Sequence, residues 1–272
     1  MLELNRHDTE TLRERFLPER PGPLVVMHLL QTGHGRCLAD RWPNPRAILV
    51  EAARNYALLG DPAALTPESL RPHVEGFVEA PGSFAPLIET AFGQVTIWKR
   101  VIFSLRAAPR YTLPRGFVVR RLHPEDAPYL EGLGPETNWV YKTWYGAVAA
   151  ASSGYFWGAF AGERLVCAAG TFFLGQRHEE IGVATEPGFR GLGLGPAFSG
   201  RLCEEIRGRA RVPSWTTSPD NAASVRVAQK LGFTFARDDR LFVVGIDTPE
   251  PPRRPAAQPK LRPSTEHPDV RA

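Results

Sequence analysis

The sequence predicts an α/β fold of the α+β kind. A mixed twisted sheet with helices on both faces is expected over residues 116–246, preceded by a smaller α+β domain over residues 1–106. Segments with strand and helix patterns alternate through the second part. A glycine-rich turn joins one of its strands to a helix, and a stretch with two prolines over residues 107–115 reads as a linker between the two parts.

Composition sets broad limits on the class of protein. The chain has 272 residues and a formal net charge of +4, with basic residues scattered rather than clustered, so no nucleic-acid partner is expected. Cys37, Cys167 and Cys203 lack the spacing of a disulfide framework or metal site, so no metal is expected. No apolar run approaches the ~18 residues of a membrane span. We therefore expect no membrane partner, and a cytoplasmic localisation.

The first part shows strand and helix patterns but no chemical motif. Thr66 and Pro67 have the residue types of a helix N-cap and first position, and Ser83 is a second expected cap. His28 and His34 are interpreted as surface or satisfied core histidines. The expected elements are helix 12–16, strands 47–50 and 56–59, a helix beginning at Thr66, strand 77–79, helix 83–92 and strand 95–105.

The second part alternates strands and helices up to about residue 246. Residues 218–221 are expected to cap a helix that ends at Gly232, a typical residue just after a helix. Residues 247–272 hold seven prolines and no aromatic residue, so we expect this tail to be disordered. The expected elements are strand 117–122, helices 123–133 and 139–150, strands 155–160, 165–173 and 179–185, helix 197–207, strand 212–217, helix 222–231 and strand 234–244.

The turn after strand 179–185 is the clearest chemical signal in the chain. It carries Arg190, Gly191, Gly193, Gly195 and Pro196 at a strand-to-helix junction. Glycines there allow close backbone approach, and the free N–H groups of a helix start attract anions, above all phosphate. The turn lacks the Lys-Ser/Thr ending of a Walker A loop and the spacing of a dinucleotide fingerprint.

Arg190, Gly193 and Gly195 instead fit the pattern Arg/Gln-x-x-Gly-x-Gly/Ala. At this point residues 116–246 resemble the GNAT N-acetyltransferase superfamily, which binds the acetyl-CoA pyrophosphate on such a loop. The stretch from Asn221 to Leu231-Gly232-Phe233 is similar to the family's second signature. The first part lacks these signatures, and by analogy it is interpreted as a degenerate GNAT-like half.

The resemblance implies roles for particular residues. The fourth and fifth strands of the family splay apart, so that Val183 and Thr185 can offer backbone groups to pantetheine, and an N–H near Val183 or Ala184 can serve as the oxyanion donor. Glu179 and Glu180 are the candidate bases, on opposite faces unless a bulge exchanges them. Glu179 is slightly favoured by its offset from the loop, and His178 is a lesser alternative. The implied cofactor-binding residues are Val183, Ala184, Thr185, Arg190, Gly191, Leu192, Gly193, Leu194, Gly195, Asn221 and Ser224.

The sequence departs from the family at the general acid. Ala228 occupies the position of the tyrosine that protonates the leaving thiolate in many members, and Tyr141 and Tyr145 are the alternatives considered. A thiol of pKa near 8.5 can still leave without full proton transfer. Asn221 also fits a purely structural N-cap role. The aromatic residues Trp139 to Tyr145 fit either core packing or the wall of an acceptor pocket.

The implied function is acetyl-CoA-dependent transfer of an acetyl group to the amine of an unidentified small molecule, by direct attack on the thioester. The alternatives are a CoA-binding regulatory module without turnover, motivated by Ala228, and an acyltransferase directed at proteins or hydroxyl groups. A homodimer is left open.

Overall fold

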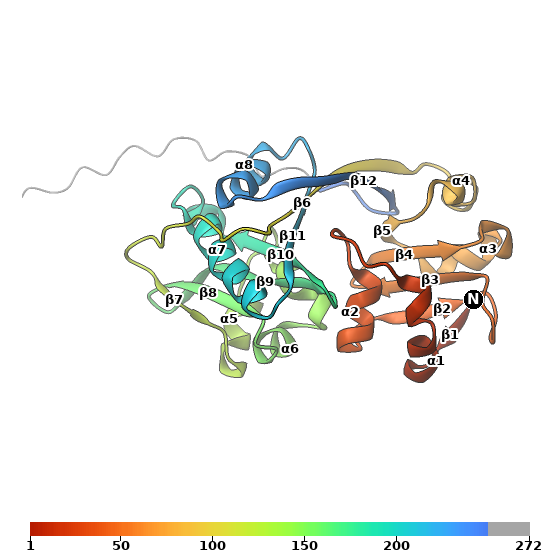
Figure 1. Ribbon diagram of the computed structural model, residues 1–272, viewed down its shortest axis with the longest axis horizontal. Helices are drawn as coiled ribbons and strands as arrows, with labels where there is room; N and C mark the ends of the chain where they lie inside the picture. The colour runs from red at the N-terminus through yellow and green to blue at the C-terminus, as the bar shows by residue number, and fades with distance from the viewer. Residues whose placement is uncertain (250–272) are drawn as a thin grey trace, which may run out of the picture.

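One mixed sheet runs through both halves of the chain in the computed structural model, which describes residues 1–249 (Figure 1). Within these residues the twelve strands lie in the order β1-β2-β3-β4-β5-β12-β6-β11-β10-β9-β8-β7. The strands are β1 (Leu2–Leu4), β2 (Arg36–Ala39), β3 (Ala47–Ala52), β4 (Asn55–Gly60), β5 (Gly76–Glu79), β6 (Thr96–Ser104), β7 (Val118–Arg121), β8 (Phe156–Ala161), β9 (Arg164–Leu174), β10 (His178–Thr185), β11 (Val212–Thr217) and β12 (Thr234–Val244).

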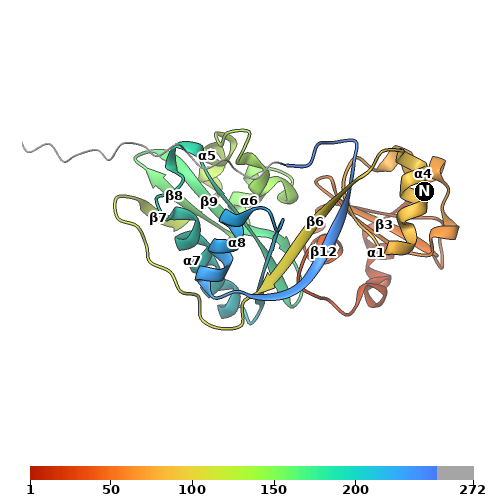
Figure 2. The ribbon, with the colours of Figure 1, turned by 90° about the horizontal axis from the view of Figure 1, so that it is seen from above.

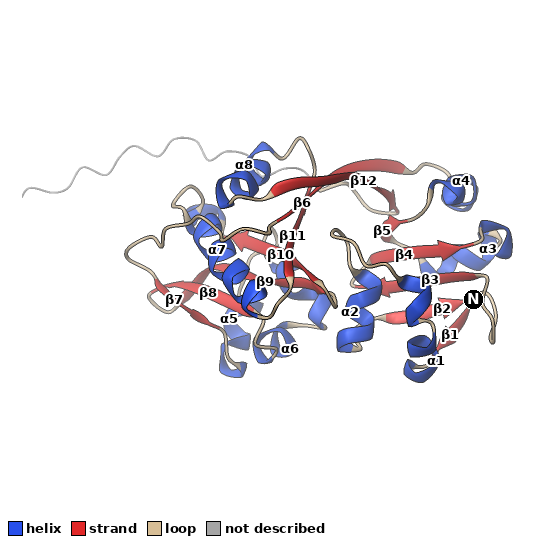
Figure 3. Cartoon of the chain, viewed as in Figure 1, coloured by secondary structure: helices blue, strands red, loops and turns tan. Residues whose placement is uncertain are grey.

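Helices cover both faces of the sheet, as the sequence predicts (Figure 3). The α-helices are α1 (Arg6–Thr11), α2 (Val25–Thr32), α3 (Pro67–Leu70), α4 (Ala85–Phe92), α5 (Ala127–Glu131), α6 (Ala147–Ser152), α7 (Leu194–Gly208) and α8 (Ala222–Leu231). Short 3₁₀ helices cover Arg13–Phe16, Pro62–Ala64, Arg71–His73, Gly82–Phe84, Pro124–Asp126, Asn138–Trp144 and Pro187–Phe189.

In the second half, two hydrophobic clusters lie on opposite faces of the sheet. Phe198, Leu202 and Ile206 of α7 pack into the first cluster with Leu231 of α8. The second cluster lies under α5 and α6 and includes Leu130, with other residues of those helices. This arrangement sandwiches the sheet between two helical layers, each of which buries its apolar stripe.

Two long strands join the halves into one sheet. β6 comes from the first half of the chain, yet it lies between β11 and β12 of the second half. β12 pairs with β6 along most of its length and then with β5 at Phe242 to Val244. Figure 2 shows β6 and β12 side by side between the two halves. Each half therefore contributes a strand to the part of the sheet that the other half forms: β6 pairs with β11, and β12 pairs with β5.

The segment between β6 and β7 contains no helix or strand, and part of it packs on α7. A Cβ atom placed on Gly200 would lie 2.4 Å from the ring of Tyr111, so only glycine lets the ring lie against the helix backbone. The Tyr111 hydroxyl donates to Glu204 at 2.7 Å. The domain boundaries proposed for residues 1–106, 107–115 and 116–246 stay predictions.

Local sequence signals predicted several elements to the residue. Strands 212–217 and 234–244 and helix 222–231 have the expected ends. The Thr66 side chain accepts from the Ser69 N–H, with Pro67 at the first helical position. Cys37, Cys167 and Cys203 are all buried and free.

The expectation of one helix over 139–150 was wrong. A 3₁₀ helix ends at Trp144, Tyr145 takes a left-handed conformation with φ of 57°, and α6 begins only at Ala147. The Thr143 hydroxyl and the Trp144 indole donate to the carbonyls of Phe172 and Thr171 at 2.5 and 2.6 Å. These bonds hold the segment on β9 rather than in a straight helix.

Other local expectations also need correction. Ser83 does not cap a helix, because Gly82–Phe84 forms a 3₁₀ turn before α4. The helix after the glycine turn starts at Leu194 rather than Ala197, because Gly193 serves as its N-cap. The elements β1, α2 and β2 were not anticipated. The predicted disorder of residues 247–272 falls almost wholly outside the described residues.

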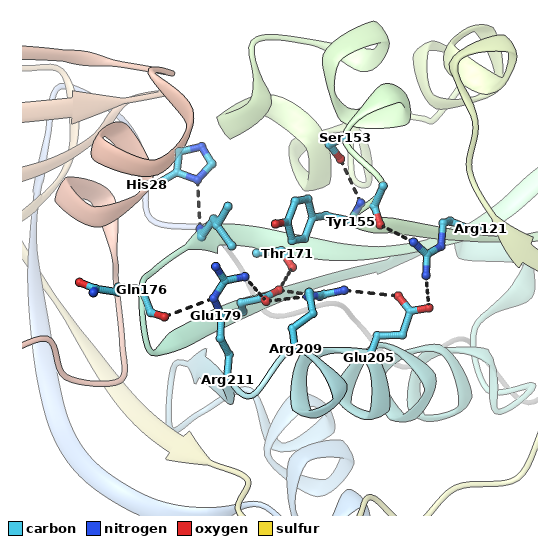
Figure 4. Close-up of polar contacts among 12 residues, drawn as sticks. His28, Arg121, Ser153, Tyr155, Thr171, Gln176, Glu179, Glu205, Arg209 and Arg211 are labelled. Atoms are coloured by element: carbon cyan, nitrogen blue, oxygen red, sulfur yellow. Dashed lines mark hydrogen bonds and ion pairs between the residues drawn. The ribbon is translucent and has the colours of Figure 1, made fainter. Parts of the chain in front are cut away.

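His28 on α2 joins the two halves through both ring nitrogens. The Leu174 N–H donates to Nδ1 at 3.0 Å, the dashed line from His28 in Figure 4. Nε2 therefore carries the proton and donates to the Thr143 carbonyl at 2.8 Å. The side chain is fully buried, as the interpretation of a satisfied core histidine requires. Burial lowers the pKa of His28 to about 4, although its bond to Thr143 opposes the shift.

We predict that His28→Gln removes part of the acid sensitivity of folding. The unfolded histidine takes up a proton below its ordinary pKa of 6.5. The folded one does so only near 4, so stability falls as pH drops through that window. The difference in pKa between the two states corresponds to about 3 kcal/mol of folding free energy. Denaturant unfolding at pH 7.5 and pH 4.5 measures it. A stability gap between the wild type and the variant that stays constant across this range would contradict the prediction.

Candidate active site

The glycine turn forms an open backbone cradle at the start of α7. Gly191 and Gly193 have φ of +84° and +81°, and a Cβ atom on either would meet nothing within 4 Å. Gly193 is the N-cap of α7, with no side-chain cap, so the first N–H groups of this 15-residue helix lack an intrahelical partner. Pro196 lies in the first turn, where it supplies no N–H. The backbone therefore presents free donors and the positive end of the helix dipole.

Two side-chain contacts of Arg190 hold the cradle in place. Its Nε donates to the Thr185 carbonyl at 3.1 Å, and its Nη2 pairs with Glu136 at 2.9 Å. The family resemblance implies that this arginine belongs to the cofactor-binding loop. In the structure its positive charge is shared with an exposed carboxylate on the segment before the 3₁₀ helix Asn138–Trp144.

Glu186, directly after β10, ties the same segment to the loop. Its buried carboxylate accepts from the Gly134 N–H at 3.0 Å and also from the Thr137 hydroxyl. Hydrogen bonds to Thr137 and Gly134 hold the pKa of Glu186 below its usual value despite burial. Two carboxylates, those of Glu136 and Glu186, therefore connect the glycine turn to residues 134–137.

β10 and β11 separate directly before the cradle. Their parallel pairing covers only His178 to Glu180 against Val212 to Ser214. Beyond Glu180 the two strands keep their outer partners, β9 and β6, but no longer pair with each other. This confirms the expected splay. The opening lies along Ile181 to Thr185, the stretch that leads into the glycine turn.

A bulge interrupts the pairing of β10 with β9, but it leaves the faces of β10 unchanged. Glu180 pairs with Phe173 and Ile181 with Thr171, so the extra residue is Phe172 on β9. Glu179 and Glu180 therefore point to opposite faces of the sheet. A Cβ atom on Gly182, which shares the face of Glu180, would lie near Phe172 and Trp139.

Glu179 is held in a buried ion cluster. Its carboxylate accepts from Arg209 at 3.0 and 2.8 Å, from Arg211 at 3.1 Å and from the Thr171 hydroxyl at 2.5 Å (Figure 4). These four bonds occupy the acceptor capacity of a carboxylate. The arrangement fits a structural charge that fastens the end of α7 to β10.

Glu180 has a different environment although it is the next residue. It is 7% exposed, and its Oε2 has no hydrogen-bond partner. Burial raises the pKa of Glu180 to about 7, while the nearby Thr216 hydroxyl and the Arg100 guanidinium pull it down. Thr216 Oγ1 also lacks a hydrogen-bond partner, so the Thr216 hydroxyl acts on the carboxyl group through its proximity. A carboxylate that titrates near neutral pH suits proton transfer.

His178, the lesser candidate base, belongs to a turn that Glu19 holds. The Glu19 carboxylate is 1% exposed and contacts His178 Nδ1 at 3.0 Å. It also accepts the backbone N–H groups of Gln176, Arg177 and His178 at 2.7 to 3.0 Å. This residue of the first half thus fastens the chain directly before the two glutamates. No sequence motif marked Glu19.

The second signature has the expected local structure. The Asn221 side chain caps α8 by accepting from the Ser224 N–H at 3.1 Å. The Ser224 hydroxyl accepts from the Trp215 indole at 3.0 Å. Ala228 is fully buried in the core between α7, α8 and the sheet. The Tyr145 hydroxyl contacts the backbone of Gly35, at 2.9 and 3.2 Å, and so binds the first half.

Charged residues that the sequence did not single out act on Glu180 from other strands: Arg100 on β6, Glu79 on β5 and Arg237 on β12. Asp239, also on β12, lies beside Arg237 and Glu79. Burial raises the pKa of Glu79 to about 7, and the nearby Asp239 adds to the rise. Arg237 contacts Asp239 at 2.7 Å and Glu79 at 3.7 Å. Only strand pairing between the halves brings these residues together.

Within residues 1–249, no group of three or more His, Cys, Asp or Glu residues is arranged to hold a metal ion. Across the same residues, none of the helices has the length and apolar character needed to cross a membrane.

Comparison with known proteins agrees with the geometry of the loop and the splayed strands. A protein of Streptomyces virginiae described as an uncharacterized N-acetyltransferase is 36% identical over 215 residues, which cover 77% of this chain and 90% of that protein. YdfB of Bacillus subtilis, also described as an uncharacterized N-acetyltransferase, is 27% identical over 49% of this chain and 50% of its own length.

Solved structures share the fold at low sequence identity. A GCN5-related N-acetyltransferase-like protein of Streptococcus suis superposes with a TM-score of 0.68 at 17% identity, over 88% of this chain and 98% of its own. A tandem GNAT protein from the clavulanic acid biosynthesis pathway superposes with a TM-score of 0.56 at 15% identity, over 91% and 99%.

The sequence also matches the GNAT acetyltransferase family across residues 19–242, most of both halves. The family implies acetyl-CoA as the donor, and the open glycine cradle with free helix N–H groups fits its diphosphate. The chain therefore belongs to the GNAT acetyltransferase family of N-acetyltransferases.

Proposed function

We propose that this protein transfers an acetyl group from acetyl-CoA to the amine of a small molecule by direct attack, with Glu180 as the general base. The observation that carries the proposal is the position of Glu180. It is the last residue of β10 that pairs with β11, at the inner end of the opening that runs to the glycine cradle.

The cofactor would be held by backbone groups. The N–H groups from Gly191 to Gly195 would bind the diphosphate, since both positive-φ glycines leave space in front of the backbone. Val183 packs against the first hydrophobic cluster, and the Thr185 hydroxyl contacts Cys167 of that cluster at 3.2 Å. Both residues are half-buried and lie along the opening, where pantetheine would run. When bound, acetyl-CoA supplies the acetyl group as an activated thioester.

Glu180 has the properties that the proton transfer needs. An alkyl amine reaches the site mainly as an ammonium ion, because its pKa lies near that of lysine. A carboxylate with a pKa near 7 accepts its proton better than an ordinary glutamate would. Glu179 lacks a free acceptor site, since two arginines and Thr171 occupy it. These contacts reverse the slight preference for Glu179 drawn from the sequence.

A backbone N–H near Val183 or Ala184 would stabilise the oxyanion, a contribution of about 3 kcal/mol in comparable sites. No tyrosine from α8 can protonate the leaving thiolate, because Ala222–Leu231 contains no tyrosine and Ala228 occupies the family's usual tyrosine position. The thiol would leave as a thiolate or take a proton from water, which its ordinary pKa allows.

Thiol release tests the activity directly. Purified protein is mixed with acetyl-CoA and a panel of small amines, and free CoA is measured with a thiol reagent. We expect amine-dependent release. Tight CoA binding without release for any amine would instead support a regulatory module. Acetylation confined to protein or hydroxyl targets would support the third alternative.

The cradle is tested by replacing Gly193 with valine. A β-branched residue at φ of +81° is strained by about 1–2 kcal/mol or more, and its side chain would fill the space before the N–H groups. Calorimetry should show CoA affinity reduced by about tenfold or more.

Gly188→Ala is the matched control for this loop. Gly188 has ordinary φ, and its added Cβ would also meet open space, so CoA affinity should remain that of the wild type. Equal affinity in the Gly193 and Gly188 variants would refute the assigned cradle.

The base is tested by a pH profile. In the wild type kcat/KM should rise with pH through about 7, as Glu180 loses its proton and becomes able to accept one. Glu180→Gln should lower kcat/KM by about a hundredfold and remove this inflection.

Glu179→Gln serves as the neighbouring control. It should lower stability by about 3 kcal/mol, because two partly buried arginines lose their partner. Its pH inflection should persist. An inflection lost from the Glu179 variant and retained by the Glu180 variant would reverse the assignment.

A further inference from the structure

A cavity of about 380 Å³ lies in the first half, beside the charged residues of β5 and β12. Phe16, Leu24, Met27 and Leu58 contribute to its apolar wall. Its volume falls within the range typical of small-molecule sites. The cofactor site proposed above consists of the glycine cradle and the opening between β10 and β11, and this cavity belongs to neither. The first half also carries no catalytic motif, so the cavity has no assigned role.

The charged residues that line the cavity are mostly acidic. They are Glu19, Arg20, Glu79 and Asp239. The carboxylate of Glu19 is already bonded to the turn before β10. Arg20 contacts Glu79 only at 3.4 Å, and its side chain is largely exposed. Arg237 pairs with both Glu79 and Asp239, and Arg100 on β6 also lies near Asp239. Both carboxylates line the cavity and neither arginine does, so the cavity side of the carboxylates can take a further positive charge.

The loop that walls the cavity also contacts the strands beside Glu180. The Gly22 N–H donates to the Ser214 hydroxyl at 3.0 Å, and Ser214 is the residue that pairs with Glu180 across β10 and β11. The Pro21 carbonyl accepts from Arg237 Nε at 3.2 Å. Glu79 is near enough to Glu180 to add to the rise of its pKa. One short loop thus lies against both the wall of the cavity and the strands beside Glu180.

We propose that this cavity binds the acceptor, and that the acceptor is an amine on an apolar body that carries a second positively charged group, bound by Glu79 and Asp239. The inference rests on the proposed function. Glu180 does not line the cavity. In the proposed arrangement its carboxylate serves the reacting amine, and Glu79 and Asp239 bind the far end of the molecule. The apolar wall accommodates the body between the two charges.

Matched amines test the substrate class. Octylamine is compared with 1,8-diaminooctane, and hexylamine with 1,6-diaminohexane, by thiol release from acetyl-CoA. A charge-assisted contact at the second nitrogen should raise kcat/KM of the better diamine by about ten- to a hundredfold over its monoamine. Equal kcat/KM for the monoamine and the diamine at both chain lengths would overturn the proposal.

Two conservative variants connect that preference to the cavity. Glu79→Gln and Asp239→Asn should each lower the ratio of diamine to monoamine kcat/KM by about tenfold, and this ratio cancels any change at Glu180 that both substrates share. Glu75→Gln is the control, since Glu75 lies just before β5, is half exposed and pairs with Arg54. A diamine advantage that survives in both cavity variants would overturn the proposal.

Binding measured without acetyl-CoA separates this inference from the proposed function. Calorimetry of 1,8-diaminooctane should show about tenfold weaker binding to Glu79→Gln than to the wild type, whether or not acetyl transfer occurs. Unchanged CoA affinity in the variant establishes that it is folded, and Asp239→Asn replaces it if that affinity is lost. Equal diamine affinity in the wild type and the folded variant would overturn the inference, and thiol release alone decides the proposed function.

Discussion

The position of β6 between β11 and β12 is the constraint on which the rest of the structure depends. A central strand must satisfy hydrogen bonds on both edges, so β6 cannot leave without exposing the edges of two other strands. It also carries Arg100 toward Glu180, and it aligns β12 so that its far end reaches β5. The proposed base and the cavity therefore owe their proximity to backbone pairing. His28 and Glu19 then fasten loops of one half onto the other.

Two adjacent glutamates illustrate how the sheet assigns different roles to the same residue type. Alternation along β10 sends Glu179 toward α7, where Arg209 and Arg211 neutralise it. It sends Glu180 toward the opposite face, where burial is only partly compensated. The first environment occupies the acceptor positions of the carboxylate, and the second leaves an acceptor oxygen available for a proton. This difference fits a role in stability for Glu179 and the proposed role in proton transfer for Glu180.

Much of the cofactor side was predictable because its signals are local. The glycines of the loop, Asn221 as a cap and Gly232 as a helix end depend on φ angles and hydrogen bonds within a few residues. The acceptor side was far less predictable. The break at Tyr145 depends on bonds from Thr143 and Trp144 to β9. Glu79 and Asp239 are 160 positions apart and have no common motif.

The sequence by itself determined the family, the glycine turn, the pair of candidate glutamates and most strands of the second half. Each of these features depends on short-range patterns of glycine, capping residues and alternating hydrophobicity. Only the tertiary structure decided which glutamate keeps a free acceptor oxygen and which residues of the first half lie beside it. Desolvation and ion pairing depend on every neighbour in space, and strands β5, β6 and β12 bring those neighbours together from distant parts of the chain.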